Sequence, residues 1–529
     1  MSERSIRRAR ERQVERAEKR GGTLGRKVAL ASGAALGATA VFAPAAQADN
    51  IVVDSLEDDG TDTTLRDAII EANGNAEPDV ITFQAGLTGT IELVSDLEIV
   101  DEELEIQGPG ASVITVDGQG GDNVFYLFSF DEPDTPVTIS GLTVTGGDDT
   151  DGGGIESGPG TDEPAELTLA DMVITGNDAS DDGGGVFVNG GSLTITNSVI
   201  SDNDADGGGG GVYTYDSGGG DESDVVIEGT TVSGNDAGYR GGGLYLHPGG
   251  TVLLRNSTFT GNSAGGYGGG LMLYGQDDVG DATLDGLTVT GNEADRGGGG
   301  LQLWGTDGTL TVQNSTVSGN TADADGNDSG SGGGIYSYNR HDEQTPRVIR
   351  NSTVVGNSAD EGGGIYHYGR SNEEGEDILP ISSTIVADNS ATEEGPDLGE
   401  NDPQEGFIEL GFSLIENLGD DATVTESPAG TNVFGQDPQL GPIQSNGGPT
   451  QPHRPAASSP AIDAGIANGL ATDQRGAPRT FDAVAVENAP GSDGTDTGSV
   501  EVQPGEGGLP GNAECKGQVV PKIDGTAGN

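Results

Sequence analysis

Residues 259–275 read FTGNSAGGYGGGLMLYG, in which two glycine-rich patches flank a tyrosine and a short apolar and aromatic run follows. Six further segments align with it, each with an asparagine, a run of glycines and a strand-like run. An eighth segment lacks the triple glycine. Counted along the chain, the asparagines of the eight segments are Asn177, Asn203, Asn235, Asn262, Asn292, Asn320, Asn357 and Asn389. Their spacing of 26 to 37 residues indicates similar structural units with loops of different length.

The unit itself predicts the fold. About 30 residues hold two or three short strands with alternating apolar and polar residues, separated by corners rich in Gly, Asn and Asp. Parallel strands need a crossover, and because no helical pattern is available, the crossover must be the rest of the coil. Stacked coils about 4.8 Å apart then form a parallel β-helix. The other all-β solution, a propeller, needs four longer strands per unit.

Two residue columns set the register of each coil. The residues three positions before the asparagines are apolar and are expected to point into the core: Ile174, Ile200, Val232, Phe259, Val289, Val317, Val354 and Val386. The residues six positions before them tolerate left-handed backbone angles and are expected at turns: Asp171, Asn197, Gly229, Asn256, Gly286, Asn314, Asn351 and Ser383. We interpret the asparagines themselves as corner residues, stacked so that their side chains hydrogen-bond along the column.

The strand after each triple glycine predicts a surface feature. If its first residue points inward, the second and fourth residues point outward and form two columns along one face. The candidate glycan-binding residues in these columns are Tyr213, Tyr215, Tyr245, His247, Tyr274, Trp304, Tyr336, Tyr338, Tyr366 and Tyr368. One interpretation is that these rings only stabilise the sheet through contacts between coils. The other is that they form an aromatic track for sugar rings.

Charge restricts the partners. The chain has 529 residues and a formal net charge of −64. Residues 1–48 combine a basic stretch, a run of small apolar residues and AQA at 46–48, which is the layout of a secretory signal peptide. They hold 10 of the 23 basic and 4 of the 87 acidic residues, so the remaining chain carries a net charge of −70. Such a chain repels nucleic acid and attracts divalent cations. A single cysteine, Cys515, excludes an intramolecular disulfide.

The acidic loops contain candidate calcium ligands. The segment DADADGNDSGSGGG offers Asp323, Asp325, Asn327 and Asp328 at alternate spacing, and hard cations prefer such oxygen ligands. A second acidic cluster, DDTDGGG, contains Asp148, Asp149 and Asp151. The alternative for both is a solvated acidic loop. Calcium is the cofactor that we expect, bound weakly at several such loops.

The domain organisation follows from these patterns. Residues 49–140 lack the triple glycine and are expected to form the N-terminal cap and first coils, with a short helix at Leu65–Ala72. Residues 141–395 form the glycine-rich repeats, and residues 396–485 form the C-terminal cap. Residues 486–529 have few apolar side chains and are expected to be a disordered acidic tail. The predicted fold is therefore an all-β parallel β-helix with two caps and disordered ends.

These motifs resemble known families. The repeat resembles those of polymorphic outer-membrane proteins and related bacterial right-handed β-helix surface proteins. Its motif is GN, then Thr or Ser followed by Ala, then GGG, then Ile or Leu followed by Tyr. TTLRDAIIEANGNAEPDVITF is similar to the region named for its CSLREA motif, although here the motif lacks the cysteine. NGGPTQPHRPAASSPAIDAG with TDQRGAPR is similar to the choice-of-anchor domain of type Q, and ECKGQVVPKIDGTAGN resembles the lead-in to calcium-binding RTX repeats. The resemblance implies a secreted or surface protein and supplies no catalytic residues.

Three functions remain open from the sequence. The first is a secreted or cell-surface adhesin, structural protein or glycan-binding module, monomeric, whose partners are polysaccharides or cell-surface components. The second is a polysaccharide lyase or hydrolase on the aromatic face, where His247 and the segment with His341, Asp342 and Glu343 are the His–carboxylate candidates. The third is a calcium-responsive RTX-like exoprotein. The strong negative charge disfavours an acidic polymer as substrate.

Overall fold

The computed structural model describes residues 50–506 with short gaps at 59–62, 75–77, 101–102, 129–135, 159–165, 217–222, 276–278, 307, 327–329, 340–345, 370–376, 402–405, 420–422 and 484–485. The signal peptide predicted for residues 1–48 and the RTX-like segment lie outside the described residues, as do His341, Asp342 and Glu343. Among the described residues, no helix is long and apolar enough to cross a membrane.

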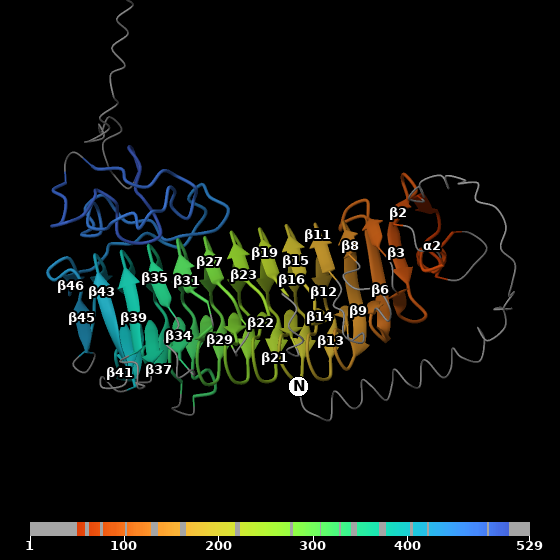
Figure 1. Cartoon of the computed structure of the whole chain (residues 1–529), viewed down its shortest axis with the longest axis horizontal. Coiled ribbons are helices and arrows are strands. Elements are labelled where there is room, and N and C mark those ends of the chain that lie inside the picture. Colours follow the sequence, from red (N-terminus) through yellow and green to blue (C-terminus); the bar gives the residue numbers. More distant parts are fainter. Residues whose placement is uncertain are drawn as a thin grey trace, which may run out of the picture. The chain divides into compact units, whose positions relative to one another are not determined.

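The described chain is a stack of coils whose corresponding strands lie side by side in parallel sheets (Figure 1). Sheet A contains β1 (Asn50–Val53), β2 (Asp79–Phe83), β5 (Leu104–Gln107), β8 (Pro136–Ser140), β11 (Glu166–Ala170), β15 (Leu193–Thr196), β19 (Val225–Glu228), β23 (Val252–Arg255), β27 (Ala282–Asp285), β31 (Leu310–Gln313), β35 (Arg347–Arg350), β39 (Asp377–Ser382), β43 (Gly406–Gly411) and β45 (Val424–Glu426).

Sheet B follows the first corner of each coil. It contains β3 (Gly89–Glu92), β6 (Ile114–Gly121), β9 (Thr143–Asp149), β12 (Val173–Thr175), β16 (Val199–Ser201), β20 (Thr231–Ser233), β24 (Thr258–Thr260), β28 (Thr288–Thr290), β32 (Thr316–Ser318), β36 (Thr353–Val355), β40 (Ile385–Ala387), β44 (Leu414–Ile415) and β46 (Val433–Phe434).

Sheet D starts from the end of β9 and consists of short strands. It contains β13 (Asp178–Ala179), β17 (Asp204–Ala205), β21 (Asp236–Ala237), β25 (Ser263–Ala264), β29 (Glu293–Ala294), β33 (Thr321–Ala322), β37 (Ser358–Glu361) and β41 (Ser390–Glu394). Sheet C, which follows the triple glycines, contains β4 (Leu97–Val100), β7 (Phe125–Phe128), β10 (Ile155–Ser157), β14 (Val186–Asn189), β18 (Val212–Tyr215), β22 (Leu244–His247), β26 (Leu271–Leu273), β30 (Leu301–Trp304), β34 (Ile335–Tyr338), β38 (Ile365–Tyr368) and β42 (Leu398–Glu400).

Each repeat coil thus has four strands, where the sequence pattern predicts two or three. The extra strand is that of sheet D, which in most coils is two residues long and too short to show alternation. Inward side chains of all coils form one continuous apolar core, and the column that includes Ile174, Phe259 and Val289 is fully buried in it. This confirms the inward column and the parallel β-helix.

The turn column is confirmed as well. Asp171, Asn197, Gly229, Asn256, Gly286, Asn314, Asn351 and Ser383 all have a positive φ, between 46° and 72°. The residues that precede the repeat asparagines form a second left-handed corner, for example Gly261 at φ 64°. The first glycine of each triplet forms a third, for example Gly268 at φ 71°. Three left-handed corners per coil explain the high content of Gly, Asn and Asp.

The repeat asparagines form a buried hydrogen-bonded ladder, as predicted. In each step the side-chain amide donates to the side-chain oxygen of the asparagine in the next coil, and the Nδ2–Oδ1 distance is 2.9 Å from Asn177 to Asn203 and at every later step to Asn389. Backbone amides of the asparagines donate to the same oxygens. The ladder ends on Asp397, a carboxylate that accepts from Asn389 at 2.9 Å.

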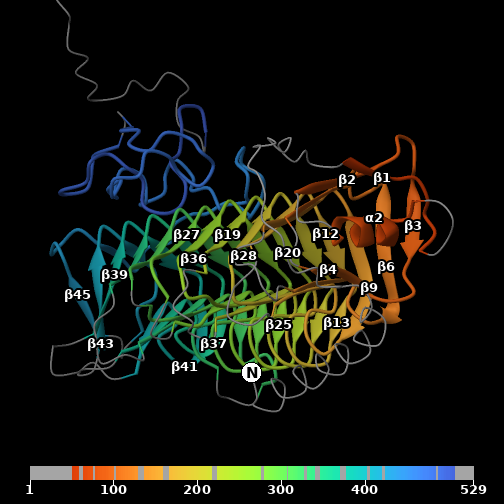
Figure 2. The same ribbon diagram turned by 45° about the vertical axis from the view of Figure 1, so that its right-hand side comes forward.

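The N-terminal coils are closed by α2 (Leu65–Ala72), which has the predicted bounds (Figure 2). Thr64 and Asp67 form a capping box at its start, and Leu65 and Ile69 are buried in the common core. Arg66 binds Asp58 and the carbonyls of Ser95 and Asp96. The helix therefore covers the apolar interior of the first coils and is tied to them by one arginine.

The C-terminal segment, residues 438–506, packs on the turn column rather than ending the stack as a further coil. Gln474 donates to the carbonyl of Leu287 at 2.9 Å, and Arg479 donates to Asn314 Oδ1 at 2.8 Å. The prediction of a disordered tail from residue 486 is wrong as far as residue 506, because Val500 and Val502 are 1% exposed. Low apolar content misled the prediction, since this segment is held mainly by hydrogen bonds.

Candidate functional site

The two predicted outward columns of sheet C differ in exposure. In the first column Tyr213, Tyr245 and Tyr366 are only 5–7% exposed. Their prediction as surface residues of an aromatic track is therefore wrong, and Tyr336 is no more than partly exposed. Burial raises the pKa of the Tyr213, Tyr245, Tyr336 and Tyr366 hydroxyls, which keeps them neutral.

The chain just before each triple glycine covers the first column. One residue per coil forms a parallel bridge to the next coil there, in the order Gly208, Arg240, Tyr267, Gly297, Ser331 and Glu361. The following glycine then turns back over the ring, and a side chain at Gly268 would contact Met272. Alternation identified the residues that point away from the core but not the second layer of chain that covers them.

The second column remains partly exposed and forms what we call the aromatic row: Tyr215, His247, Tyr274, Trp304, Tyr338 and Tyr368. Six consecutive coils supply one residue each: five lie at the ends of β18, β22, β30, β34 and β38, and Tyr274 directly follows β26. Adjacent ring centroids lie 5.3, 5.0, 4.5, 4.9 and 5.2 Å apart along the row. The planes of these neighbours make angles of 36–83°, so the rings are not a parallel stack.

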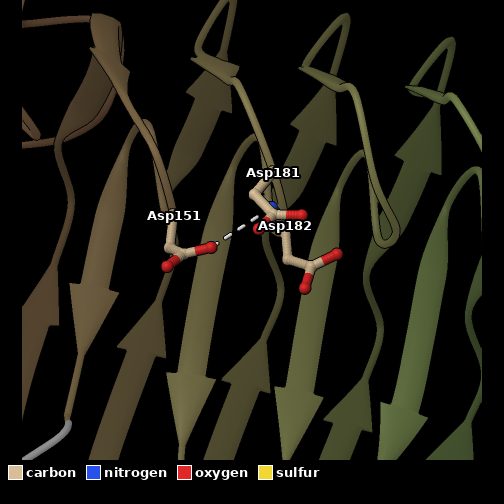
Figure 3. Close-up of side chains that lie close together, drawn as sticks. All are labelled: Asp151, Asp181 and Asp182. Atoms are coloured by element: carbon tan, nitrogen blue, oxygen red, sulfur yellow. Dashed lines mark hydrogen bonds between the residues drawn. The ribbon is translucent and has the colours of Figure 1, made fainter. Parts of the chain in front are cut away.

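Several carboxylates gather on the early coils beside the first column, where Asp182 interacts with Tyr213. Asp151, Asp181 and Asp182 have carboxylate oxygens within 4.8 Å of one another (Figure 3). Asp151 and Asp182 are buried, at 3% and 6% exposure, and Asp151 accepts from the backbone amide of Asp182. Burial, with the charge of Asp181, raises the pKa of Asp182 to about 6. Oxygen ligands in this arrangement suit a hard divalent cation.

The residues predicted from sequence as calcium ligands are placed differently. Asp323 is half-buried and Asp325 is exposed, while Asn327 and Asp328 lie outside the described residues. Of the second acidic cluster, Asp148 pairs with Asp178 in sheet D, and Asp151 joins Asp181 and Asp182 instead. The sequence did not indicate that Asp151 lies close to Asp181 and Asp182, because these partners are about thirty residues further along the chain, in the next coil.

Sheet D carries an acidic ladder on the surface. Asp178 pairs with Asp148 and Asp204, and Asp204 pairs with Asp236, so four aspartates stand at the same position in successive coils. Desolvation and the neighbouring carboxylates raise the pKa of Asp178 and of Asp204. Adjacent like charges at this spacing repel, which makes this edge of the coils strongly negative.

A buried ionic group replaces apolar residues in the core of the later coils. Arg347 donates to both carboxylate oxygens of Asp377 at 2.6 Å, and His367 Nε2 lies 3.6 Å from Asp377. All three side chains are at most 2% exposed. Desolvation and the charge of Arg347 lower the pKa of His367 to about 4. Strand alternation does not predict this ionic group, although the histidine of IYHY stands at an inward position of β38.

No curated protein matches the chain. Among solved structures, the chain is similar to the A-module of the mannuronan C-5 epimerase AlgE6 of Azotobacter vinelandii, with 15% identity over 70% of this chain and 94% of that chain and a TM-score of 0.47. It is also similar to pectate lyase Pel9A, with 13% identity over 86% and 97% of the two chains and a TM-score of 0.37. The Dettilon tailspike protein has 15% identity over 68% of each chain and a TM-score of 0.32.

The family comparison gives the hand of the coil. Residues 103–286 match the family described as the right handed beta helix region. The matched range begins near β5 and ends after β27, so it covers coils on both sides of the first triple glycine. The chain is therefore an all-β protein that folds as a right-handed parallel β-helix.

Proposed function

We propose that this protein is a secreted or cell-surface β-helix that binds a neutral glycan along the aromatic row. The observation that carries the proposal is the row itself, in which six partly exposed rings from six consecutive coils lie at centroid distances of 4.5–5.3 Å. A polymer aligned with the stacking direction of the coils meets a similar group at every coil. Repetition of weak contacts in this way adds up to useful affinity.

The chemistry of the row suits sugars. Aromatic rings offer apolar contact to the C–H faces of a sugar, and the Tyr hydroxyls and the His247 imidazole offer hydrogen bonds to its hydroxyls. Because neighbouring planes are tilted by 36° or more, part of each ring stays accessible beside the next one. A row of rings also stabilises sheet C, so binding and stability must be measured separately.

Electrostatics favours a neutral ligand. Residues 49–529 carry a net charge of −70, and two aspartates of the acidic ladder, Asp204 and Asp236, belong to the first two coils of the row. An acidic polysaccharide or a nucleic acid would approach against this field. The field also keeps such a surface protein soluble and separate from anionic lipid.

A glycan panel tests the proposal. Hexasaccharides of cellulose, xylan, mannan and chitin, with oligogalacturonate as the acidic member, are titrated against the protein. The double variant Tyr338→Ala/Tyr368→Ala should weaken the best ligand about tenfold or more, since each lost ring contact contributes roughly 1 kcal/mol. Phe434→Ala, an aromatic residue 39% exposed on sheet B, is the matched control. Equal affinity of the double variant and the wild type would refute the row as a site.

The same panel separates binding from catalysis. A polysaccharide lyase or hydrolase is the alternative for a site on this face, and either would release shorter or unsaturated oligosaccharides from a bound ligand. Chromatography of the ligand after incubation is therefore part of the experiment. Intact ligand supports a binding module, whereas processed ligand assigns the protein to the enzymes.

Calcium binding is a second proposed property, favoured by the three carboxylates of Asp151, Asp181 and Asp182. Calcium takes six to eight oxygen ligands, so backbone carbonyls or water would complete the site. Calcium should raise the melting temperature and a chelator should lower it, and Asp182→Asn should reduce both effects. Asp325→Asn changes the exposed loop that the sequence predicts as a calcium site. Comparing its effect with that of Asp182→Asn shows which of the two locations binds calcium. A melting temperature that does not respond to calcium would refute both sites.

A further inference from the structure

We infer that Tyr239, Arg240, Tyr267 and Arg296, here called the arginine–tyrosine patch, form a subsite that recognises vicinal hydroxyls of a neutral sugar. The inference rests on the proposed function and extends it, because it names the chemistry by which the ligand would be selected. The patch lies beside the middle of the aromatic row, at Tyr274.

The backbone holds the patch rigidly. Arg240 and Tyr267 are consecutive members of the bridge ladder that covers the first aromatic column. The amide of Tyr267 donates to the carbonyl of Tyr239 at 3.0 Å, and the amide of Arg296 donates to the carbonyl of Gly266 at 2.9 Å. The four residues therefore come from three successive coils at fixed spacing, as a recognition site for a repeating polymer requires.

Ring contacts connect the patch to the row. The guanidinium carbon of Arg240 lies 4.6 Å from the ring centroid of Tyr239 and 5.7 Å from that of Tyr274. Arg296 lies 6.0 Å from the ring of Tyr267. Tyr239 is 40% exposed and Arg296 is exposed, so the patch faces solvent. These cation–π contacts fix the position of each guanidinium group beside the rings.

The two arginines differ from others of the chain in their partners. Arg66, Arg347 and Arg475 each form an ion pair with an aspartate. Within the described residues neither Arg240 nor Arg296 forms one, and Nε of Arg240 is buried without a hydrogen-bond partner. Arg240 interacts instead with the side chains of Tyr239 and Tyr245, whereas the exposed guanidinium of Arg296 keeps donors accessible to a ligand.

The surroundings decide between a neutral and an acidic ligand. Asp295, next to Arg296, has its pKa raised by desolvation and by Asp325 and Asp323, with Arg296 opposing the shift. The patch thus adjoins a negative surface, and the repulsion of a ligand carboxylate by these aspartates opposes its attraction to the arginines. Two adjacent hydroxyl oxygens match the donor fork of a guanidinium without adding charge.

The test uses the neutral hexasaccharide that binds the full chain best. Arg240→Lys keeps the charge and removes the planar fork, and Arg296→Gln removes the charge on an exposed side chain. Each should weaken binding about tenfold, because a hydrogen bond to a charged donor contributes roughly that factor. Affinity should be nearly equal in about 0.05 M and about 0.5 M NaCl, since the ligand is neutral. Arg255→Lys, on sheet A, is the control and should bind as the wild type does.

Each outcome has one interpretation. Wild-type affinity of both Arg240→Lys and Arg296→Gln overturns the subsite, and if Tyr338→Ala/Tyr368→Ala still loses affinity, the proposed function stands without it. Tighter binding of oligogalacturonate that weakens with salt overturns the neutral-sugar assignment in favour of an anion subsite. Failure of every neutral hexasaccharide to bind overturns the proposed function and the subsite together. If Arg240→Lys lowers the melting temperature, the conclusion rests on Arg296→Gln, because Arg296 is exposed and its substitution should not disturb folding.

Discussion

A single asparagine oxygen shows how each coil is fixed to the next. Oδ1 of Asn292 accepts from the backbone amide and the side-chain amide of Asn262, at 3.0 and 2.9 Å. The Nδ2 group of Asn292 donates to the carbonyl of Phe259 and to Asn320. All four hydrogen bonds lie in the dry interior, where unpaired polar groups are expensive. The asparagine therefore specifies both the corner and the alignment of neighbouring coils.

Asn292→Ala should be strongly destabilising. It leaves two donors of Asn262 and the carbonyl of Phe259 without their partners, which should lower the free energy of unfolding by about 3 kcal/mol. Urea unfolding followed by circular dichroism measures the change. Glu293→Ala, at the exposed adjacent position of β29, is the control and should change stability by less than about 0.5 kcal/mol. Similar values for the two variants would contradict the structural role of the ladder.

The buried imidazole of His367 should make the stability of the fold sensitive to acid. Its pKa is about 4 in the folded protein, below the ordinary 6.5, because desolvation and Arg347 oppose its charge. The unfolded chain therefore binds a proton between pH 6.5 and 4 that the folded chain does not, so stability falls as the pH falls through this window. The loss should be about 3 kcal/mol. His367→Leu should remove this part of the pH dependence, measured as the difference in urea midpoints between pH 7 and 4.5.

At the scale of the elements, the triple-glycine corner has two different requirements for glycine. Gly268 has a φ of 71°, which other residues adopt only with strain. Gly269 has no such angle, but a Cβ there would meet the carbonyl oxygen of Glu293 in the next coil. Gly268 is required because its own backbone has a left-handed conformation. Gly269 is required because the backbone of the next coil leaves no room for a Cβ atom.

Two alanine substitutions separate these requirements. Gly261→Ala, where φ is 64° and nothing lies within 4 Å of the added methyl, should cost about 1 kcal/mol of backbone strain. Gly269→Ala should cost more than about 3 kcal/mol, because the coils must move apart. Thermal unfolding of the two variants gives the comparison. A larger effect at Gly261 than at Gly269 would contradict the close stacking of the triplets.

The elements also show where sequence reasoning succeeds. The columns of Ile174, Asp171 and Asn177 could be predicted because each depends on chain neighbours that recur in every unit. The burial of Tyr213 and Tyr245 could not, since it depends on chain that folds back over them after a left-handed corner. Whether these rings face solvent depends on which other chain segment packs over them, and alternation along one strand gives no information about that.

At the scale of the whole molecule, the C-terminal segment decides which part of the turn column is exposed. It hydrogen-bonds to the turns at Gly286, Asn314, Asn351 and Ser383, which are buried, whereas the same position is exposed at Asp171, Asn197 and Gly229. Several of these contacts join residues more than a hundred positions apart. No periodic pattern in the sequence indicates such contacts, and the docking of residues 486–506 was therefore missed.

Two buried acids inside this segment make its docking depend on pH. Asp496 and Glu501 are at most 1% exposed, and each accepts two backbone amides, with Asp496 donating its own amide to Glu501. Burial raises the pKa of Asp496 to about 7, and burial with the charge of Asp496 raises that of Glu501. The charged groups around them include Asp463, Asp473, Arg475 and Arg479.

The sign follows from the raised pKa values, since protonated acids favour the docked segment. Docking is fully stabilised below about pH 4 and weakens as the pH rises from there to about 7, where Asp496 loses its proton in the docked segment. Hydrogen exchange of residues 460–506, corrected for the intrinsic effect of pH, should show protection that falls over this range. The coils of β14 and β18 serve as the internal control and should keep theirs. Glu501→Gln, which cannot ionise, should reduce the slope, and an unchanged slope would assign the pH dependence to other groups.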